Sequence, residues 1–244
     1  MLTGRYVKIE MLPLSFKEYA SVNDRKQIKE EVFNNYLEFG SFPYVSALEP
    51  DKELIQHDHE GLYSTLFIKD NIQKNGIDNV TLLERLTKFL MQNIGCKTSS
   101  KKISDSLKVG GLSGNQKTID KYLVSLLDGY LFYEAQRFGV KGRQIFSTLS
   151  KYYAVDSGLK HSLIKQTQRD FGYVLENVVY LELRRRGFSV FVDQLDGDLE
   201  IDFVCVKGDE TIYYQVSATT LDERTLEREL KPFARVRIIF RSIY

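Results

Sequence analysis

The sequence predicts an α/β protein, α+β overall, in which helices fill most of the first half and strands enter in the second half. Residues 26–75 and 79–128 carry apolar residues at helical spacing with charged faces between them. From residue 130 onward the pattern changes to short runs rich in β-branched and aromatic residues, which is typical of strands. A chain of 244 residues is long enough for one large domain or two modest ones.

The composition is that of an ordinary globular protein, and it excludes several classes. With 34 Lys and Arg against 33 Asp and Glu, the net charge of +1 gives no global attraction to nucleic acid or to a membrane, so any such binding must come from local patches. The two cysteines and three histidines match no metal spacing, and no apolar run of about 18 residues is present to span a bilayer. We therefore expect a cytoplasmic protein with free thiols and no membrane partner.

The first part of the chain is expected to be mainly helical. A short strand is expected across Tyr6–Leu12, and Ser15 is placed to cap a helix that starts at Phe16. The stretch GSFPYVSALEPDK, residues 40–52, carries the Gly and Pro residues of a loop between two longer helices. A strand so near Met1 without a hairpin partner predicts that the fold begins upstream of this chain.

The middle of the chain has the element order of a winged helix-turn-helix. The segment NVTLLERLTKFLMQNIG predicts its first helix, with a capping box of Thr81 and Glu84 at the start and Gly95 as the stop. A short helix over Ser100–Leu107 and a Gly-rich turn follow.

A third helix then ends at Gly129, with Ser113 or Asn115 as its N-cap. Two β-rich runs around a turn at residues 139–142 complete the order as a two-stranded wing.

The Gly-rich turn GGLSGNQKT resembles a phosphate-binding loop but does not match its spacing. The template G-x-x-x-x-G-K-[ST] needs a glycine directly before the lysine. Counted from Gly111, that position is Gln116, followed by Lys117, and the preceding SDSLKV is helical rather than a buried strand. We therefore expect no ATP site and no cofactor in this chain.

The third helix of the predicted winged helix offers a polar face to DNA. Lysines suit phosphate contacts, and Asn or Gln side chains can read adenine edges. The candidate DNA-binding residues are Asn115, Gln116, Lys117, Lys121, Lys141 and Arg143. The alternative is a solvated face on a winged helix that only packs against neighbouring domains.

Residues 170–216 contain a candidate metal site. Glu176 lies in a helix that ends at Gly187, Asp202 lies in the strand-like run EIDFVCV, and Gln215 lies in the next run, YYQVS. A helix Glu, a strand Asp and an oxygen acceptor on the adjacent strand can hold magnesium, with Glu176 and Asp202 as the metal ligands. The alternative is that both carboxylates only make internal hydrogen bonds.

This arrangement is a degenerate form of the one in restriction-endonuclease-like metal nucleases, which use Asp followed by Glu-x-Lys. Here Gln215 stands at the Glu position and Ser217 at the Lys position. The catalytic set Glu176, Asp202 and Gln215 therefore lacks the charged partner that cleavage needs. A helix over DERTLERELKPF and a strand at VRIIF are expected to complete this α/β domain.

Several phrases together resemble a widespread prokaryotic family of AAA-type ATPases. They are LTGRYVKIEMLPLSFKEY, GSFPYV, LYSTLFIKDNI, TIDKYLVSLLDGYLFYEAQRFGVKG, SKYYAVDSGL, GYVLENVVYLELRRRGF, EIDFV and YYQVS. In that family a P-loop ATPase domain is followed by a winged helix and a restriction-endonuclease-like domain of unknown function. The resemblance implies that residues 1–75 are the end of the ATPase core and its helical lid. It places the winged helix in residues 76–160 and the restriction-endonuclease-like domain in residues 161–244.

The resemblance also implies a longer parent protein that binds ATP and magnesium through segments upstream of Met1. Arg5 would fall near the end of the ATPase core, and residues 13–40 would form its helical lid. The implied function of this chain is recognition of DNA or of a protein partner, or self-association. The other readings are a metal-dependent nuclease and a purely structural assembly module.

Overall fold

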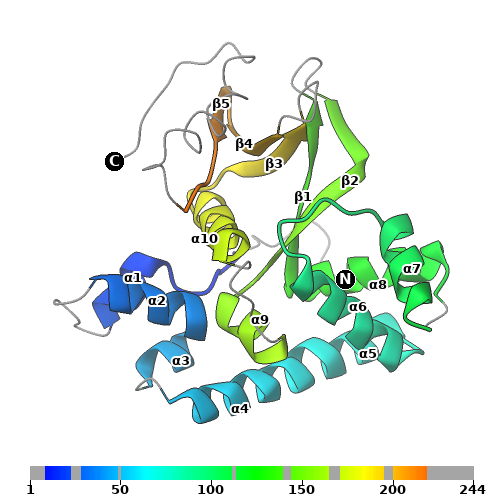
Figure 1. The fold of residues 1–244 in the computed structure, drawn as a ribbon, viewed down its shortest axis with the longest axis horizontal. Coiled ribbons are helices and arrows are strands. Elements are labelled where there is room, and N and C mark those ends of the chain that lie inside the picture. The colour runs from blue at the N-terminus through cyan, green and yellow to red at the C-terminus, as the bar shows by residue number, and fades with distance from the viewer. Residues whose placement is uncertain are drawn as a thin grey trace.

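The computed structural model describes residues 9–22, 29–48, 51–111, 114–139, 144–164, 171–194 and 200–218. Within them the protein is a mixed α and β structure, with helices around a five-stranded sheet (Figure 1). The first half contains α1 (Phe16–Val22), α2 (Lys29–Phe39), α3 (Pro43–Ala47), α4 (Lys52–Leu62), the π-helix η1 (Tyr63–Lys69), α5 (Asp70–Asn75), α6 (Val80–Gln92), α7 (Ser100–Val109) and α8 (Gln116–Asp128). The second half contains β1 (Phe132–Gly139), β2 (Gln144–Ala154), α9 (Ser157–Leu163), α10 (Phe171–Arg185), β3 (Ser189–Gln194), β4 (Glu200–Lys207) and β5 (Glu210–Tyr214).

The sheet joins the β1–β2 hairpin to the later strands in the order β2-β1-β3-β4-β5. Strand β1 pairs antiparallel with β2, and it runs parallel to β3 with Arg137 opposite Val192. Strand β4 pairs antiparallel with both β3 and β5. The sheet therefore continues across residue 160, where the family resemblance places a boundary between two domains.

Helix α10 packs against β2, β3 and β4, and so joins both parts of the sheet. The ring of Tyr180 stacks on that of Tyr153 with centroids 4.1 Å apart, and the ring of Phe203 lies 5.7 Å from that of Tyr153. Strands β2 and β4 are not neighbours in the sheet. Their side chains nevertheless meet beside α10, which packs against both strands.

One buried apolar cluster extends from the helices of the first half to the sheet. In α8 the buried positions recur at the spacing of one helix face, as the sequence predicts. Full burial of one such aliphatic side chain stabilises the fold by about 1.5–3 kcal/mol. The fully buried members from α6 to α8 include Leu83, Leu86, Met91, Ile103, Ile119 and Leu126.

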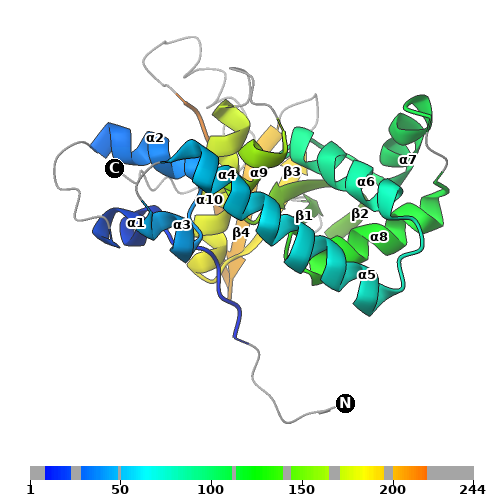
Figure 2. The ribbon, with the colours of Figure 1, turned by 90° about the horizontal axis from the view of Figure 1, so that it is seen from below.

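Helices α4, η1 and α5 follow one another without a break along one side of the molecule (Figures 1 and 2). Helix α4 contacts α9, whereas α5 contacts α8. The three consecutive helices therefore connect two ends of the molecule. One end is formed by α1, α2, α3 and α9, and the other by α6, α7 and α8. None of the described helices has both the length and the apolar character needed to cross a membrane.

Two of the predicted helix starts are confirmed. The amide of Ser15 donates to the Glu18 carboxylate at 2.7 Å, and the Ser15 hydroxyl accepts from the Glu18 amide at 3.2 Å. Asn115 is the N-cap of α8, because its Oδ1 accepts from the amide of Thr118 at 2.9 Å. Ser113, the other candidate, lies outside the described residues.

Three local predictions are wrong. Helix α6 begins at Val80 with Asn79 as its N-cap, because Asn79 Oδ1 accepts from the amide of Leu82 at 2.9 Å; Thr81 lies inside the first turn. The expected loop over residues 40–52 contains the short helix α3, which has a proline at its first position. Residues 9–12, the described part of the expected first strand, are irregular.

Candidate functional site

The residues of the predicted metal site meet beside α10, together with a lysine. We define the carboxylate–lysine cluster as Glu176 of α10, Asp202 of β4, and Lys151 and Tyr153 of β2. Glu176 faces the sheet because it lies one helical turn before the buried Tyr180, and Lys151 and Tyr153 share one face of β2. All four are buried, with exposed fractions of 8% for Glu176, 9% for Asp202, 4% for Lys151 and 0% for Tyr153.

Both carboxylates of the cluster face the same ammonium group. Lys151 Nζ lies 2.8 Å from Glu176 Oε1 and 3.9 Å from Asp202 Oδ1. The Tyr153 hydroxyl donates to the same Glu176 Oε1 at 2.7 Å. Glu176 therefore accepts two hydrogen bonds from β2, one of them charge-assisted, and these bonds tie α10 to the sheet.

Asp202 and Gln215 each also bind a backbone amide where β4 and the end of β5 lie side by side. Asp202 Oδ2 accepts from the amide of Val216 at 2.9 Å. In return, Gln215 Oε1 accepts from the amide of Asp202 at 3.2 Å. The structure thus brings Glu176, Asp202 and Gln215 together, and Asp202 and Gln215 also hold two chain segments in register.

The charge of Lys151 is stabilised by its surroundings. Burial by itself lowers the pKa of a lysine, but the carboxylates of Glu176, Asp202 and Glu200 outweigh it and raise the pKa of Lys151 above its ordinary value. Burial and the Glu176 carboxylate also raise the pKa of Tyr153 well above its ordinary value. At neutral pH the cluster therefore contains an ammonium and an un-ionised phenol.

The connection between α6 and α7 covers the cluster. Gly95 donates its amide to Tyr152 O at 3.0 Å and has φ +70°. A Cβ atom at Gly95 would lie 3.2 Å from the Tyr173 ring and 3.4 Å from both carboxylate oxygens of Glu176. Next to it, burial raises the pKa of the Cys96 thiol. Helix α6 ends at Gln92 with Asn93 as its C-cap, so Gly95 is not the stop that the sequence predicts. Its lack of a side chain instead allows the chain to pass over Glu176.

The cluster does not fit a divalent cation. Magnesium takes near-octahedral oxygen ligands at about 2.0–2.1 Å, whereas a hydrogen-bond donor already lies between Glu176 and Asp202. Gln215 directs its amide oxygen to the backbone instead. Among the described residues, no group of three or more His, Cys, Asp and Glu side chains is placed to hold a metal ion.

The candidate DNA-binding residues fall into three groups. Asn115, Gln116 and Lys117 are exposed together at the start of α8. Lys121 is also exposed, but its Nζ donates to the carbonyl of Gly76 at 2.7 Å, so it partly serves to hold the end of α5. The last two candidates lie outside the described residues and are Lys141 and Arg143.

Helices α7 and α8 begin side by side. Gln116 Nε2, in the first turn of α8, donates to Ser100 Oγ, in the first turn of α7, at 3.3 Å. Ser99 caps α7, since its hydroxyl accepts from the amide of Lys102 at 3.3 Å. The two helix starts thus share one surface, on which Lys101 is also exposed.

A second group of buried polar residues joins the α2–α3 connection to α9. We call it the Asp156 junction and define it by Asp156, Ser41 and His59. Asp156 Oδ2 accepts from the amide of Ser41 at 2.7 Å, and Asp156 Oδ1 accepts from the amide of Leu159 at 2.9 Å. His59 lies against it, with Nε2 4.0 Å from Asp156 Oδ1 and Nδ1 2.8 Å from Ser162 Oγ. Sequence alone indicates only turn chemistry at Asp156.

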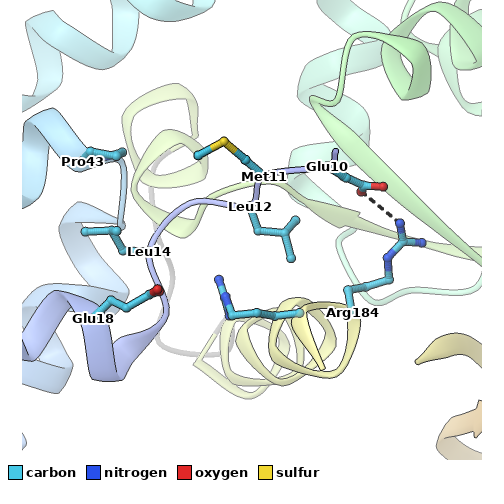
Figure 3. Close-up of a pocket in the computed structure, with 8 residues that line it drawn as sticks. Glu10, Met11, Leu12, Leu14, Glu18, Pro43 and Arg184 are labelled. Atoms are coloured by element: carbon cyan, nitrogen blue, oxygen red, sulfur yellow. Dashed lines mark hydrogen bonds and ion pairs between the residues drawn. The ribbon is translucent and has the colours of Figure 1, made fainter. Parts of the chain in front are cut away.

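A pocket of about 390 Å³ lies between residues 10–18 and the C-terminal end of α10 (Figure 3). Arg184 donates to Glu10 at 3.0 Å, as Figure 3 shows, and Arg185 donates to the carbonyl of Pro13 at 2.6 Å. These arginines hold the N-terminal segment against α10. Among the residues that the structure describes, no candidate site residue from the sequence lines this pocket.

Sequence reasoning missed Lys151 and Tyr153. Their alternation in SKYYAV places both on one face of a strand, which is the only local signal. The sequence gives no sign that this face meets Glu176, because the contact depends on how α10 packs against β2.

Residues 30–170 match a family described as a domain of unknown function (DUF8612). An uncharacterized protein of Haemophilus influenzae is 36% identical over 233 residues, which are 94% of this chain and 57% of that protein. An uncharacterized protein of Methanocaldococcus jannaschii is 30% identical over 251 residues, which are 96% of this chain and 54% of that protein. The chain therefore spans about half the length of these relatives. No solved structure matches it.

Proposed function

We propose that this chain, which belongs to the family described as a domain of unknown function (DUF8612), binds DNA through a winged helix-turn-helix formed by α6, α7, α8 and the β1–β2 hairpin. The observation that carries the proposal is the surface where α7 and α8 begin side by side. We call it the twin-helix start and define it by Ser100, Lys101, Asn115, Gln116 and Lys117.

The twin-helix start suits phosphate groups. The first turn of a helix presents unpaired backbone amides and the positive end of its dipole, so two adjacent helix starts add their fields. Lys101 and Lys117 are exposed there, and neither has an ion-pair partner within the part of the chain that the structure describes. Both ammonium groups are therefore available to a DNA backbone.

We expect the twin-helix start to bind DNA with weak selectivity for base sequence. Asn115 Oδ1 already accepts from Thr118, and the Gln116 amide already donates to Ser100. Bidentate reading of adenine by Asn or Gln needs both the oxygen and the nitrogen of the side chain. We expect phosphate contacts to dominate, so that binding depends strongly on salt.

The carboxylate–lysine cluster favours recognition over cleavage. Its two carboxylates face Lys151 rather than an open space, and Gln215 is bonded to the backbone. The cluster then serves to hold β2, β4 and α10 together. A metal-dependent nuclease has no support from this geometry.

We further propose that DNA binding is coupled to ATP hydrolysis in a longer protein. The relatives are nearly twice as long as the matched segment, which leaves room for the P-loop ATPase domain that the resemblance implies. ATP and magnesium would bind in that domain and not in the described part of this chain.

The proposal is tested by measuring the affinity for a short DNA duplex over a series of salt concentrations. Each lost phosphate contact flattens the plot of log affinity against log salt by about 0.9. Replacing Lys101 and Lys117 together by Ala should therefore reduce the slope by about 2. The control is Lys17→Ala, because Lys17 is exposed on α1, at the opposite end of the molecule in Figure 1.

An unchanged slope in the double variant would remove the twin-helix start from the proposal. Absence of salt-sensitive binding by the unaltered chain would contradict DNA recognition itself.

A further inference from the structure

Two buried carboxylates converge on a lysine from β2, a strand that packs against α10 but is not adjacent to β4 in the sheet. Glu176 and Asp202 lie on α10 and β4, whereas Lys151 lies on β2, at the far edge of the sheet. We infer that the Lys151 ammonium is the resident cation of this site and that it excludes divalent metal ions. The inference does not depend on the proposed DNA binding.

Charge balance makes a cation necessary here. Two buried carboxylates without a counter-charge repel each other and lose hydration, which is strongly destabilising. With Lys151 the carboxylate–lysine cluster carries a formal charge of −1, and Lys97 lies at its edge, 2.5 Å from Glu200. The positive charge that a metal would supply is therefore already built into the fold.

The distances suit an ammonium and not a metal. The 2.8 Å between Lys151 Nζ and Glu176 Oε1 is a charge-assisted hydrogen bond, whereas magnesium–oxygen bonds measure about 2.0–2.1 Å. The Tyr153 hydroxyl donates to the same oxygen, so the groups around Glu176 Oε1 are hydrogen-bond donors. A metal ion in contact with Glu176 Oε1 would need further oxygen lone pairs around it, and the neighbouring groups present N–H and O–H donors instead.

The inference predicts that removing the ammonium exposes a latent cation site. In Lys151→Ala the oxygens of Glu176 and Asp202 would face each other across the space that the lysine leaves. Hard divalent cations bind such carboxylate pairs. The inference is tested with Mn²⁺ alone as the probe, measured by electron paramagnetic resonance on the full chain.

Five proteins are compared: the unaltered chain, Lys151→Ala, Asp202→Asn, Lys151→Ala combined with Asp202→Asn, and Lys52→Ala. The last is the control, because Lys52 forms an ion pair with the single carboxylate of Glu38 on the surface. We expect Lys151→Ala to bind one Mn²⁺ at least about tenfold more tightly than the unaltered chain. The added Asp202→Asn change should abolish this gain, and Lys52→Ala should show none.

Two results would overturn the inference. One is that the unaltered chain binds Mn²⁺ and loses this binding in Asp202→Asn alone. The other is that Lys151→Ala folds but binds no Mn²⁺.

If Lys151→Ala does not fold alone, refolding only with Mn²⁺ supports the inference. If it folds in neither condition, side-chain NMR of the unaltered chain decides. A Lys151 ammonium signal that persists in Mn²⁺ supports the inference, and loss of this signal by paramagnetic broadening contradicts it.

Discussion

Asp156 and Ser41 lie 115 residues apart in the sequence, and the Asp156 carboxylate accepts hydrogen bonds from both the amide and the hydroxyl of Ser41, at 2.7 and 3.2 Å. Both residues are buried. The same carboxylate caps α9 through the amide of Leu159. One side chain thus fixes the connection between α2 and α3 against the start of α9, and the close approach of the two segments depends on glycine.

Gly40→Ala should disrupt this junction. Gly40 has φ +82°, and a Cβ atom there would lie 2.1 Å from Asp156 Oδ1. Left-handed strain and overpacking together should lower the free energy of unfolding by about 2–5 kcal/mol. Gly76→Ala is the matched control, because Gly76 also has positive φ but open space around its Cβ position, and it should cost about 1–2 kcal/mol. Equal losses in urea unfolding of the two variants would contradict the steric account.

Tyr153→Phe should weaken the carboxylate–lysine cluster without removing the aromatic stack. The change deletes the hydrogen bond to Glu176 Oε1 but keeps the ring against Tyr180. A hydrogen bond to a charged group contributes about 1.5–3 kcal/mol, which is the expected loss in the free energy of unfolding. Tyr44→Phe, at an exposed position, should change it by less than about 0.5 kcal/mol. If Tyr153→Phe leaves the free energy of unfolding unchanged, Glu176 does not need this hydrogen-bond donor.

The start of α6 is tested by a pair of alanine variants. Asn79→Ala removes the cap that accepts from the amide of Leu82 and should cost about 1 kcal/mol. Thr81→Ala changes an exposed residue inside the first turn and should have little effect, since Ala is a good helix former. Thermal unfolding of both variants decides whether Asn79 or Thr81 is the N-cap. A larger loss of stability in Thr81→Ala than in Asn79→Ala would support the capping box that the sequence predicts.

Acidification should destabilise the fold through the buried His59 and the partly buried His161. Burial lowers the pKa of His59, against the opposing effect of Asp156, and it also lowers the pKa of His161. His59 Nε2 lies 4.0 Å from Asp156 Oδ1, too far for a hydrogen bond. The unfolded chain therefore takes up protons at a higher pH than the folded one, so stability falls as the pH drops below about 6.5.

Urea unfolding between pH 7.5 and pH 5 measures this loss. It should be smaller in His59→Gln, which cannot take up a proton. The exposed His57, changed to Asn, is the matched control for the loss of one imidazole. An unchanged profile in His59→Gln would show that His59 does not contribute to it.

Much of the helical structure could be predicted because its causes are local. The spacing of Ile119, Tyr122 and Leu126 and the cap at Asn115 are sufficient to predict α8. The cap of α6 could not be chosen with certainty, because Asn79 and Thr81 are both good N-cap residues two positions apart.

The sheet and the candidate site depend on contacts that no local pattern contains. The parallel pairing of β1 with β3 brings together residues such as Arg137 and Val192. The sequence predicts Glu176, Asp202 and Gln215 as neighbours. At the position where the nuclease motif has its lysine, the sequence has Ser217 and therefore predicts a site without a lysine. The lysine comes instead from β2, as Lys151, because α10 packs against β2 as well as β4.

We propose that this chain recognises DNA without metal-dependent cleavage. The most direct test incubates it with supercoiled DNA at two salt concentrations, with and without Mg²⁺, and uses one gel to detect both a mobility shift and strand cleavage. We predict a shift that weakens at the higher salt, is independent of Mg²⁺ and leaves the DNA intact. Mg²⁺-dependent cleavage that disappears in Asp202→Asn would contradict the claim, as would the absence of any shift at either salt concentration.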